Sequence, residues 1–281
     1  MMDAVTRLVV WLNAAANALG RVMLAPIGAL PGWLSATIVS VVTGLSLLFA
    51  FKYTSNQRAI KRTRDDISAH LLALKLFKES ASVALRAQGR IFAGALSLLA
   101  LAVVPVLLMA VPVSLLLGQL SLWYESRPLG VGEEAVVTLR LDGDAARAWP
   151  DVSLEPTGAV EVTAGPVRVL SKREVCWSFR ARESGYHRLV FRVDGQPADK
   201  ELAVGDSFMR VSARRPGWHW SDVLMHPGET PFGPGSRVRS IEVDYPARAS
   251  WTSGTGSWVI YWFVTSLVAG LFFRRFLNVH V

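Results

Sequence analysis

The chain has 281 residues, of which 51% are hydrophobic, and it carries a net charge of +8 with a mean hydropathy of +0.32. The hydropathy is high for a soluble protein, and the cations lie beside apolar runs, so the composition favours a membrane protein over a basic DNA-binding one. The single cysteine, Cys176, excludes an intramolecular disulfide and a cysteine-based metal site.

The first thirty residues predict an amphipathic helix at the outer membrane surface. Asn13, Asn17 and Arg21 fall away from its apolar residues. A membrane span over residues 8–30 is the alternative, but it would bury that arginine and both asparagines at high cost. The segment also lacks the pattern of a cleaved signal peptide. The apolar residues at helical spacing are Leu8, Val9, Leu12, Ala15, Ala16 and Leu19.

Three uncharged apolar runs predict three membrane-spanning helices, at residues 31–51, 92–123 and 258–273. About 20 apolar residues are needed to cross a hydrocarbon core of roughly 30 Å, so the second run is longer than required and the third is short. The second run contains Pro105 and Pro112, which membrane helices tolerate better than soluble ones.

The segment between the first two runs is strongly basic. Residues 52–90 contain nine lysines and arginines but only three acidic residues, which predicts a cytoplasmic location by the positive-inside rule. Residues 125–256 then lie outside or in the periplasm, and the third span returns to the cytoplasm at Arg274 and Arg275. The sequence therefore predicts a multi-pass protein of the cell membrane.

This basic segment is predicted to form a coiled-coil helical hairpin. Ile60, Ile67 and Leu74 are seven residues apart, and Leu71 is assigned to the same seam. Four cations are predicted to bind lipid headgroups or a partner, although charges that only fix the membrane orientation are the alternative. These cations are Arg58, Lys61, Arg62 and Arg64.

Residues 125–206 alternate between apolar and polar side chains and contain frequent turn residues, which predicts a small β-sandwich. Residues 183–187 resemble a late strand of immunoglobulin-like domains, with Tyr186 at a strand corner and Cys176 and Trp177 in the core of the neighbouring strand. Residues 207–256 are rich in aromatic residues, proline and glycine. Only residues 238–245 are predicted as a strand, and Trp218, Trp220 and Trp251 are predicted to anchor the rest to the outer leaflet.

The predicted fold class is thus an α+β membrane protein with four parts. Residues 1–124 hold the surface helix, two spans and the hairpin at 52–90. Residues 125–206 form the sandwich, residues 207–256 an external segment, and residues 257–281 the third span and a cytoplasmic tail.

The sequence contains few residues suited to chemistry. His219, Asp222 and His226 have a spacing compatible with a metal site on a helix, but flanking prolines and a glycine disfavour it, so no metal and no cofactor are predicted. No nucleophile elbow or phosphate-binding loop is found, and we predict no enzymatic activity. Ser40 and Thr43 give the first span a polar side, suited either to helix packing or to a water-filled groove.

The order of surface helix, span, basic hairpin, span and span resembles the core of the YidC/Oxa/Get membrane-insertase superfamily, including its archaeal YidC-like branch. Residues 51–80 and the flanking spans carry this resemblance, over about half of the chain. It implies a hairpin that meets the ribosome or targeting factors, and a hydrophilic groove with a positive residue that receives a nascent membrane protein. Here the first span contains no cation, and Lys52 at its end is the nearest substitute.

The resemblance predicts an insertase or membrane-protein chaperone, with Ser40, Thr43 and Lys52 near the groove. The sandwich, inserted between the second and third spans, is a departure from the family pattern. The alternative is a non-enzymatic envelope scaffold or adaptor that binds an envelope protein through the sandwich.

Overall fold

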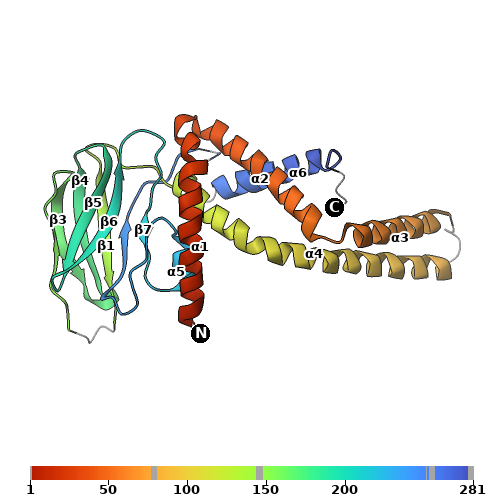
Figure 1. Ribbon diagram of the computed structural model, residues 1–281, viewed down its shortest axis with the longest axis horizontal. Helices are drawn as coiled ribbons and strands as arrows, with labels where there is room; N and C mark the ends of the chain where they lie inside the picture. Colours follow the sequence, from red (N-terminus) through yellow and green to blue (C-terminus); the bar gives the residue numbers. More distant parts are fainter. Residues whose placement is uncertain (1, 77–80, 144–147, 251, 253–256, 278–281) are drawn as a thin grey trace. The chain divides into compact units, whose positions relative to one another are not determined.

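In the computed structural model the chain is an α+β protein (Figure 1). The structure describes all residues except 1, 77–80, 144–147, 251, 253–256 and 278–281. Lys78, Glu79 and Trp251, which were counted among the predicted charges and anchors, lie outside the described residues. The helices are α1 (Met2–Met23), η1 (Ala25–Ala29), α2 (Gly32–Thr54), α3 (Gln57–Leu76), α4 (Ala81–Tyr124), η2 (Leu170–Lys172), α5 (Trp220–Met225) and α6 (Ser257–Phe273). The strands are β1 (Glu134–Leu141), β2 (Val152–Leu154), β3 (Val160–Val169), β4 (Glu174–Ala181), β5 (Gly185–Val193), β6 (Gln196–Val204), β7 (Arg214–Arg215) and β8 (Val238–Val243).

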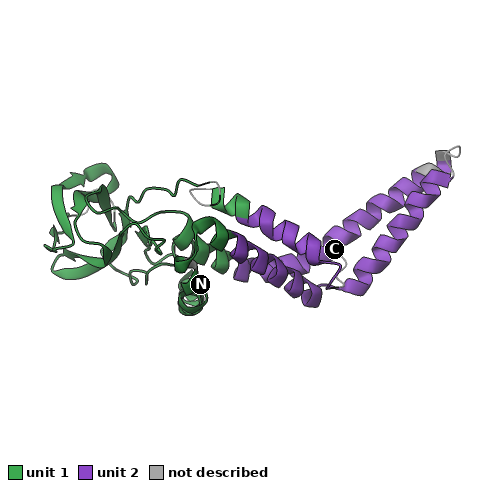
Figure 2. Ribbon diagram, turned by 90° about the horizontal axis from the view of Figure 1, so that it is seen from above, with its two compact units in different colours: residues 1–36, 114–261 green, residues 37–113, 262–281 purple. Residues whose placement is uncertain are grey.

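The chain divides into two compact units, coloured separately in Figure 2. Unit 1 comprises residues 1–36 and 114–261, and therefore holds α1, all the strands and α5. Unit 2 comprises residues 37–113 and 262–281, and holds most of α2, all of α3, and the larger parts of α4 and α6.

The strands of unit 1 form two antiparallel sheets that share one hydrophobic core. The larger sheet has the order β3-β4-β1-β8-β7 and the smaller has the order β2-β5-β6. Successive residues of a strand face opposite sides, so the apolar positions of β1 and β4 point to the same interior. Trp177 of the larger sheet meets Phe191 of the smaller with 5.2 Å between ring centroids. This confirms the predicted β-sheet region.

The sheet extends beyond the predicted boundary at residue 206. β8 coincides with the predicted strand at 238–245 and pairs with β1, and β7 pairs with β8 in turn. β7 and β8, which lie within residues 207–250, therefore complete the larger sheet, in contrast to the expected loop along a membrane. Alternation is hidden in this segment because α5 and its loops interrupt the strands.

One expectation about the sandwich interior is wrong. Cys176 and Trp177 cannot both face the core, because neighbours on a strand point in opposite directions. Trp177 is buried, whereas Cys176 is half-buried on the other face beside Thr138. Tyr186 is 54% exposed, and its hydroxyl bonds the backbone N–H and carbonyl of Arg210 at 3.1 and 3.2 Å.

α1 ends at Met23, well before the start of α2, so residues 8–30 do not form one continuous helix. Its asparagines face the protein: Asn13 Nδ2 donates to the carbonyl of Val223 at 2.6 Å, and Asn17 Nδ2 to that of Pro227 at 2.7 Å. One apolar face is exposed within the part of the chain that is described. That face consists of Val5, Leu8, Trp11, Leu19, Val22 and Met23.

α3 lies beside the first half of α4 and forms the predicted helical hairpin (Figures 1 and 2). The 44 residues of α4 extend roughly 66 Å at about 1.5 Å per residue, twice the thickness of a hydrocarbon core. The two helices pack closely at Gly94, where a Cβ atom would lie 2.6 Å from Ile67 Cγ1.

The seam of this hairpin differs from the predicted one at a single position. Ile60 is buried and Ile67 and Leu74 are half-buried, but Leu71 is 53% exposed. The partly buried His70 takes the second position of the repeat, because it lies three residues after Ile67 on the side that faces α4.

Two helices, α2 and α4, are long and apolar enough to cross a membrane. α6 has 17 residues and is apolar but shorter. The fold therefore agrees with the predicted membrane association at the level of two candidate spans.

Candidate functional site

Unit 2 contains an apolar cavity of about 380 Å³ between α2, α4 and α6. Its lining is aliphatic and aromatic except for one hydroxyl, that of Ser266, which donates to the carbonyl of Trp262 on its own helix. The lining residues are Gly44, Leu47, Leu48, Phe51, Met109, Val113, Trp262, Phe263, Ser266, Leu267, Gly270 and Leu271.

Trp262, which lines this cavity, carries one unsatisfied polar atom. Its side chain is buried, and the indole Nε1 has no hydrogen-bond acceptor among the described residues. A buried N–H without a partner costs about 1–3 kcal/mol. This N–H is itself enclosed by protein atoms, so the surface that the cavity offers to a ligand is apolar.

Small residues allow α2 and α6 to approach closely at one edge of the cavity. A Cβ atom on Gly44 would lie 2.3 Å from the carbonyl oxygen of Ser266, and one on Gly270 would lie 3.7 Å from that of Gly44. Ser40 and Gly44, like Ser266 and Gly270, are four residues apart, which is the spacing of small residues at packed membrane helices.

The structure does not bring the predicted groove residues together around this cavity. Ser40 and Thr43 are buried, and Thr43 Oγ1 donates to the carbonyl of Val39 at 2.7 Å, so neither lines it. Lys52 lies roughly 18 Å further along α2 than Ser40, at about 1.5 Å per residue. The polar side of α2 therefore fits helix packing better than a water-filled groove.

Lys52 instead contacts the segment that follows α6. Its Nζ donates to the carbonyl of Leu277 at 2.9 Å. Lys52 thus links the ends of α2 and α6.

The four predicted headgroup- or partner-binding cations lie on the first two turns of α3. Arg58, Lys61, Arg62 and Arg64 are all exposed, and none forms an ion pair with another described residue. Since α3 begins three residues after α2 ends, these charges lie close to the end of a candidate membrane span. Their role as a binding surface stays a prediction.

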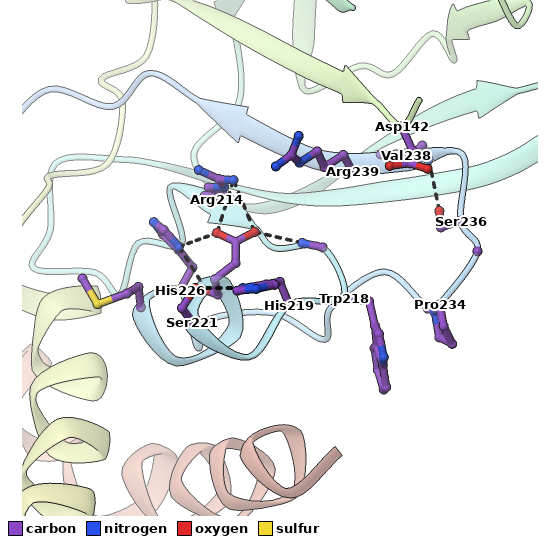
Figure 3. Close-up of a pocket in the computed structure, with 15 residues that line it drawn as sticks. Asp142, Arg214, Trp218, His219, Ser221, His226, Pro234, Ser236, Val238 and Arg239 are labelled. Atoms are coloured by element: carbon purple, nitrogen blue, oxygen red, sulfur yellow. Dashed lines mark hydrogen bonds and ion pairs between the residues drawn. The ribbon is translucent and has the colours of Figure 1, made fainter. Parts of the chain in front are cut away.

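Unit 1 contains a larger polar cavity of about 850 Å³ next to α5, β7 and β8 (Figure 3). Asp222 is its central acceptor, with the guanidinium of Arg214 and the imidazole of His226 each at 3.2 Å and the N–H of Gly217 at 3.1 Å. Burial acts to raise the pKa of Asp222, but the hydrogen bonds from His226 and Gly217 and the charge of Arg214 outweigh it and hold that pKa below its usual value.

The side chains of this cavity form neither a catalytic triad nor a metal site among the described residues. A triad needs a serine and an acidic residue bonded to the same imidazole. Here Ser221 bonds His219 at 2.8 Å, whereas Asp222 contacts the other histidine, His226. No group of three histidine, cysteine or acidic side chains suited to a metal ion occurs among the described residues.

Replacing Asp222 with asparagine is expected to destabilise the protein by about 1–3 kcal/mol at pH 7, because the partly buried Arg214 guanidinium loses its charged acceptor. Since the folded-state pKa of Asp222 is lowered from 3.8, the wild-type advantage exists above pH 4 and disappears as the pH falls through that lowered value. Unfolding measured between pH 3 and 7 tests this. Asp244→Asn, at an exposed position, is the matched control, and an equal loss in both variants would contradict the assignment.

The chain matches no protein-family model, no curated protein and no solved structure.

Sequence reasoning missed the residues that define the apolar cavity. The paired small residues of α2 and α6 are a readable signal, because both pairs have the spacing of packed membrane helices. The unpaired indole of Trp262 has no such signal, since an aromatic residue near the end of a predicted span indicates a membrane interface equally well.

Proposed function

We propose that the protein binds an apolar membrane helix of another protein, as an insertase or membrane-protein chaperone does. The apolar cavity between α2, α4 and α6 is the observation that carries this proposal. Two of its three helices have the length and composition of membrane spans, so the lining lies where an apolar segment would be found.

The apolar side chains on one face of the bound helix are the proposed occupant of this cavity, because its lining is aliphatic and aromatic. Gly44 and Gly270 already bring α2 and α6 together, and that contact forms one edge of the binding site.

The proposed topology places the α3–α4 hairpin in the cytoplasm and the sheets of unit 1 outside, as an immunoglobulin-like domain. The excess of cations in residues 52–90 supports this orientation, with α6 as a third span. The exposed apolar face of α1 supports a position on the outer membrane surface, since α1 is joined by a short connection to the candidate span α2. Arg58, Lys61, Arg62 and Arg64 would then recruit a ribosome or anionic lipid.

Site-specific photo-crosslinking tests the proposal. A photoreactive residue in place of Leu267, inside the cavity, is expected to crosslink a nascent apolar segment during membrane insertion. The same residue in place of Leu107, an exposed residue of α4 outside the lining, is the control. Equal crosslinking at both positions, or none at Leu267 in active membranes, would exclude the cavity as the binding site.

The polar cavity of about 850 Å³ in unit 1 supports a second candidate function, an envelope scaffold that binds an external partner. A photoreactive residue in place of the exposed His219 would then crosslink an envelope protein in intact cells, while the Leu267 position gives no product.

A further inference from the structure

A buried lysine organises the polar interior of unit 1. Lys200 is 0% exposed, and its Nζ donates to the Glu229 carboxylate at 2.5 Å and to the carbonyls of Ser212 and Glu201 at 2.5 and 2.9 Å. The second oxygen of Glu229 accepts the N–H of Glu201 at 2.9 Å. All three protons of the ammonium are used, so this pair is a structural anchor.

A second cavity, of about 360 Å³, lies beside that anchor and is lined by α1 as well as by the sheet. Its charged lining is balanced, with three arginines and three carboxylates. The lining residues are Asn17, Arg21, Tyr186, His187, Arg188, Asp199, Glu201, Arg215, Gly228, Glu229 and Thr230.

Several of these charges are already satisfied within the protein. Arg215 donates to the carbonyl of Thr230 at 2.9 Å and to both the carbonyl and the carboxylate of Asp199. Glu229 is held by Lys200. These groups shape the cavity and have little capacity left for a ligand.

Three charged groups of the cavity retain binding capacity. Arg21 on α1 makes no hydrogen bond or ion pair with any described residue. Arg188 is 74% exposed and has one loose contact, with Asp199 at 3.4 Å. Glu201 has a buried Oε1 that accepts no hydrogen bond from a described residue and lies 3.9 Å from Arg210 Nη1.

The free groups are of opposite sign, so an anion or a cation alone would satisfy only some of them. The Glu201 carboxylate can rotate about its terminal torsion and present either oxygen to the cavity. A ligand with a phosphate for the arginines and a primary ammonium for Glu201 would satisfy all three.

From this arrangement we infer that the cavity binds a phosphate linked to a primary amine, the chemistry of a phosphoethanolamine lipid headgroup. The inference rests on one part of the proposed function, namely that α1 lies at the membrane surface. That position of α1 brings the cavity to the level of the lipid headgroups. The source of the ligand is then the outer leaflet. Choline headgroups bind less well because a trimethylammonium has no N–H to donate to Glu201.

The test measures which lipids the full-length protein retains. The protein is placed in nanodiscs of equimolar phosphatidylethanolamine, phosphatidylcholine and phosphatidylglycerol, released, and its bound lipid is identified by native mass spectrometry. We expect phosphatidylethanolamine to be retained roughly 10-fold over phosphatidylcholine, the effect of one charge-assisted hydrogen-bonded contact. Equal retention of the three lipids, or a preference for phosphatidylglycerol, would overturn the inference.

Single substitutions test whether the preference for phosphatidylethanolamine arises in this cavity. Glu201→Gln is expected to abolish the preference for phosphatidylethanolamine over phosphatidylcholine, and Arg21→Gln to reduce retention of both lipids. Arg7→Gln, an exposed arginine on the same helix, is the matched control and should behave as wild type. If Glu201→Gln fails to fold, the exposed Arg188→Gln replaces it and should reduce retention of both lipids. Unchanged selectivity in the folded variants would contradict the site.

A competition experiment distinguishes a membrane lipid from a soluble ligand that carries the same phosphoethanolamine group. Soluble glycerophosphoethanolamine that displaces the lipid at micromolar concentration identifies a soluble ligand of the same class, whereas displacement only at millimolar concentration identifies the membrane lipid. Crosslinking at Leu267 is read separately, so loss of lipid selectivity with intact crosslinking rejects this site and leaves the proposed function standing.

Discussion

Replacing Gly44 with leucine is expected to separate α6 from α2 and to lower the stability of unit 2 by about 3 kcal/mol, the upper end of the cost of overpacking. A Cβ atom at this position would meet the carbonyl oxygen of Ser266 at 2.3 Å, and backbone cannot move aside as a flexible side chain can. Because this contact forms one edge of the apolar cavity, crosslinking at Leu267 should fall as well. Denaturant titration of the protein in detergent measures the loss of stability.

Gly89→Leu is the matched control for that experiment. Gly89 also lies in a helix, but a Cβ atom there would meet no atom within 4 Å. Leucine is a better helix former than glycine by nearly 1 kcal/mol, so this variant should be as stable as wild type or slightly more so. Similar losses at the two glycines would show that α2 and α6 do not pack through Gly44.

Lys200→Met is the second substitution with a large expected effect, a loss of about 3–5 kcal/mol. It removes one partner of a buried ion pair and leaves the Glu229 carboxylate without its cation and the Ser212 carbonyl without its donor. Global unfolding followed by tryptophan fluorescence checks this value, because Trp177 is in the core of the same unit.

An exposed ion pair serves as the comparison. Arg180 and Glu134 lie 2.5 Å apart, with about half of each side chain exposed, so Arg180→Met should cost less than about 1 kcal/mol. The double variant Lys200→Met with Glu229→Leu should recover part of the loss by removing both charges. Equal destabilisation by Lys200→Met and Arg180→Met would show that the buried pair does not anchor the unit.

The sequence allowed the elements with strong periodicity to be predicted. The apolar runs of α2 and α4, the hairpin of α3 with α4, and β8 all follow from hydropathy or alternation, which are local properties. The role of residues 207–250 in the larger sheet could not be read, because β7 is two residues long and β8 pairs with β1 about a hundred residues away. Pairing over that distance has no local pattern.

The candidate sites could be predicted from the sequence to a smaller extent than the helices and strands. Lys52 lies in the last turn of α2, as its place after the first apolar run predicts, but its contact with Leu277 depends on where α6 ends. Arg21 and Glu201 are 180 positions apart and line one cavity because tertiary contacts such as that of Asn17 with the loop at Pro227 hold α1 there. Such sites arise from tertiary packing, so residue type and spacing do not reveal them.

The orientation of the chain in the membrane is the central claim, and labelling of single cysteines in intact cells tests it most directly. In a Cys176→Ser background, Lys61→Cys and Lys172→Cys place one exposed thiol on α3 and one on η2. A membrane-impermeant maleimide is predicted to label Lys172→Cys in intact cells and Lys61→Cys only after permeabilisation. Labelling of Lys61→Cys in intact cells, with Lys172→Cys protected, would contradict the account.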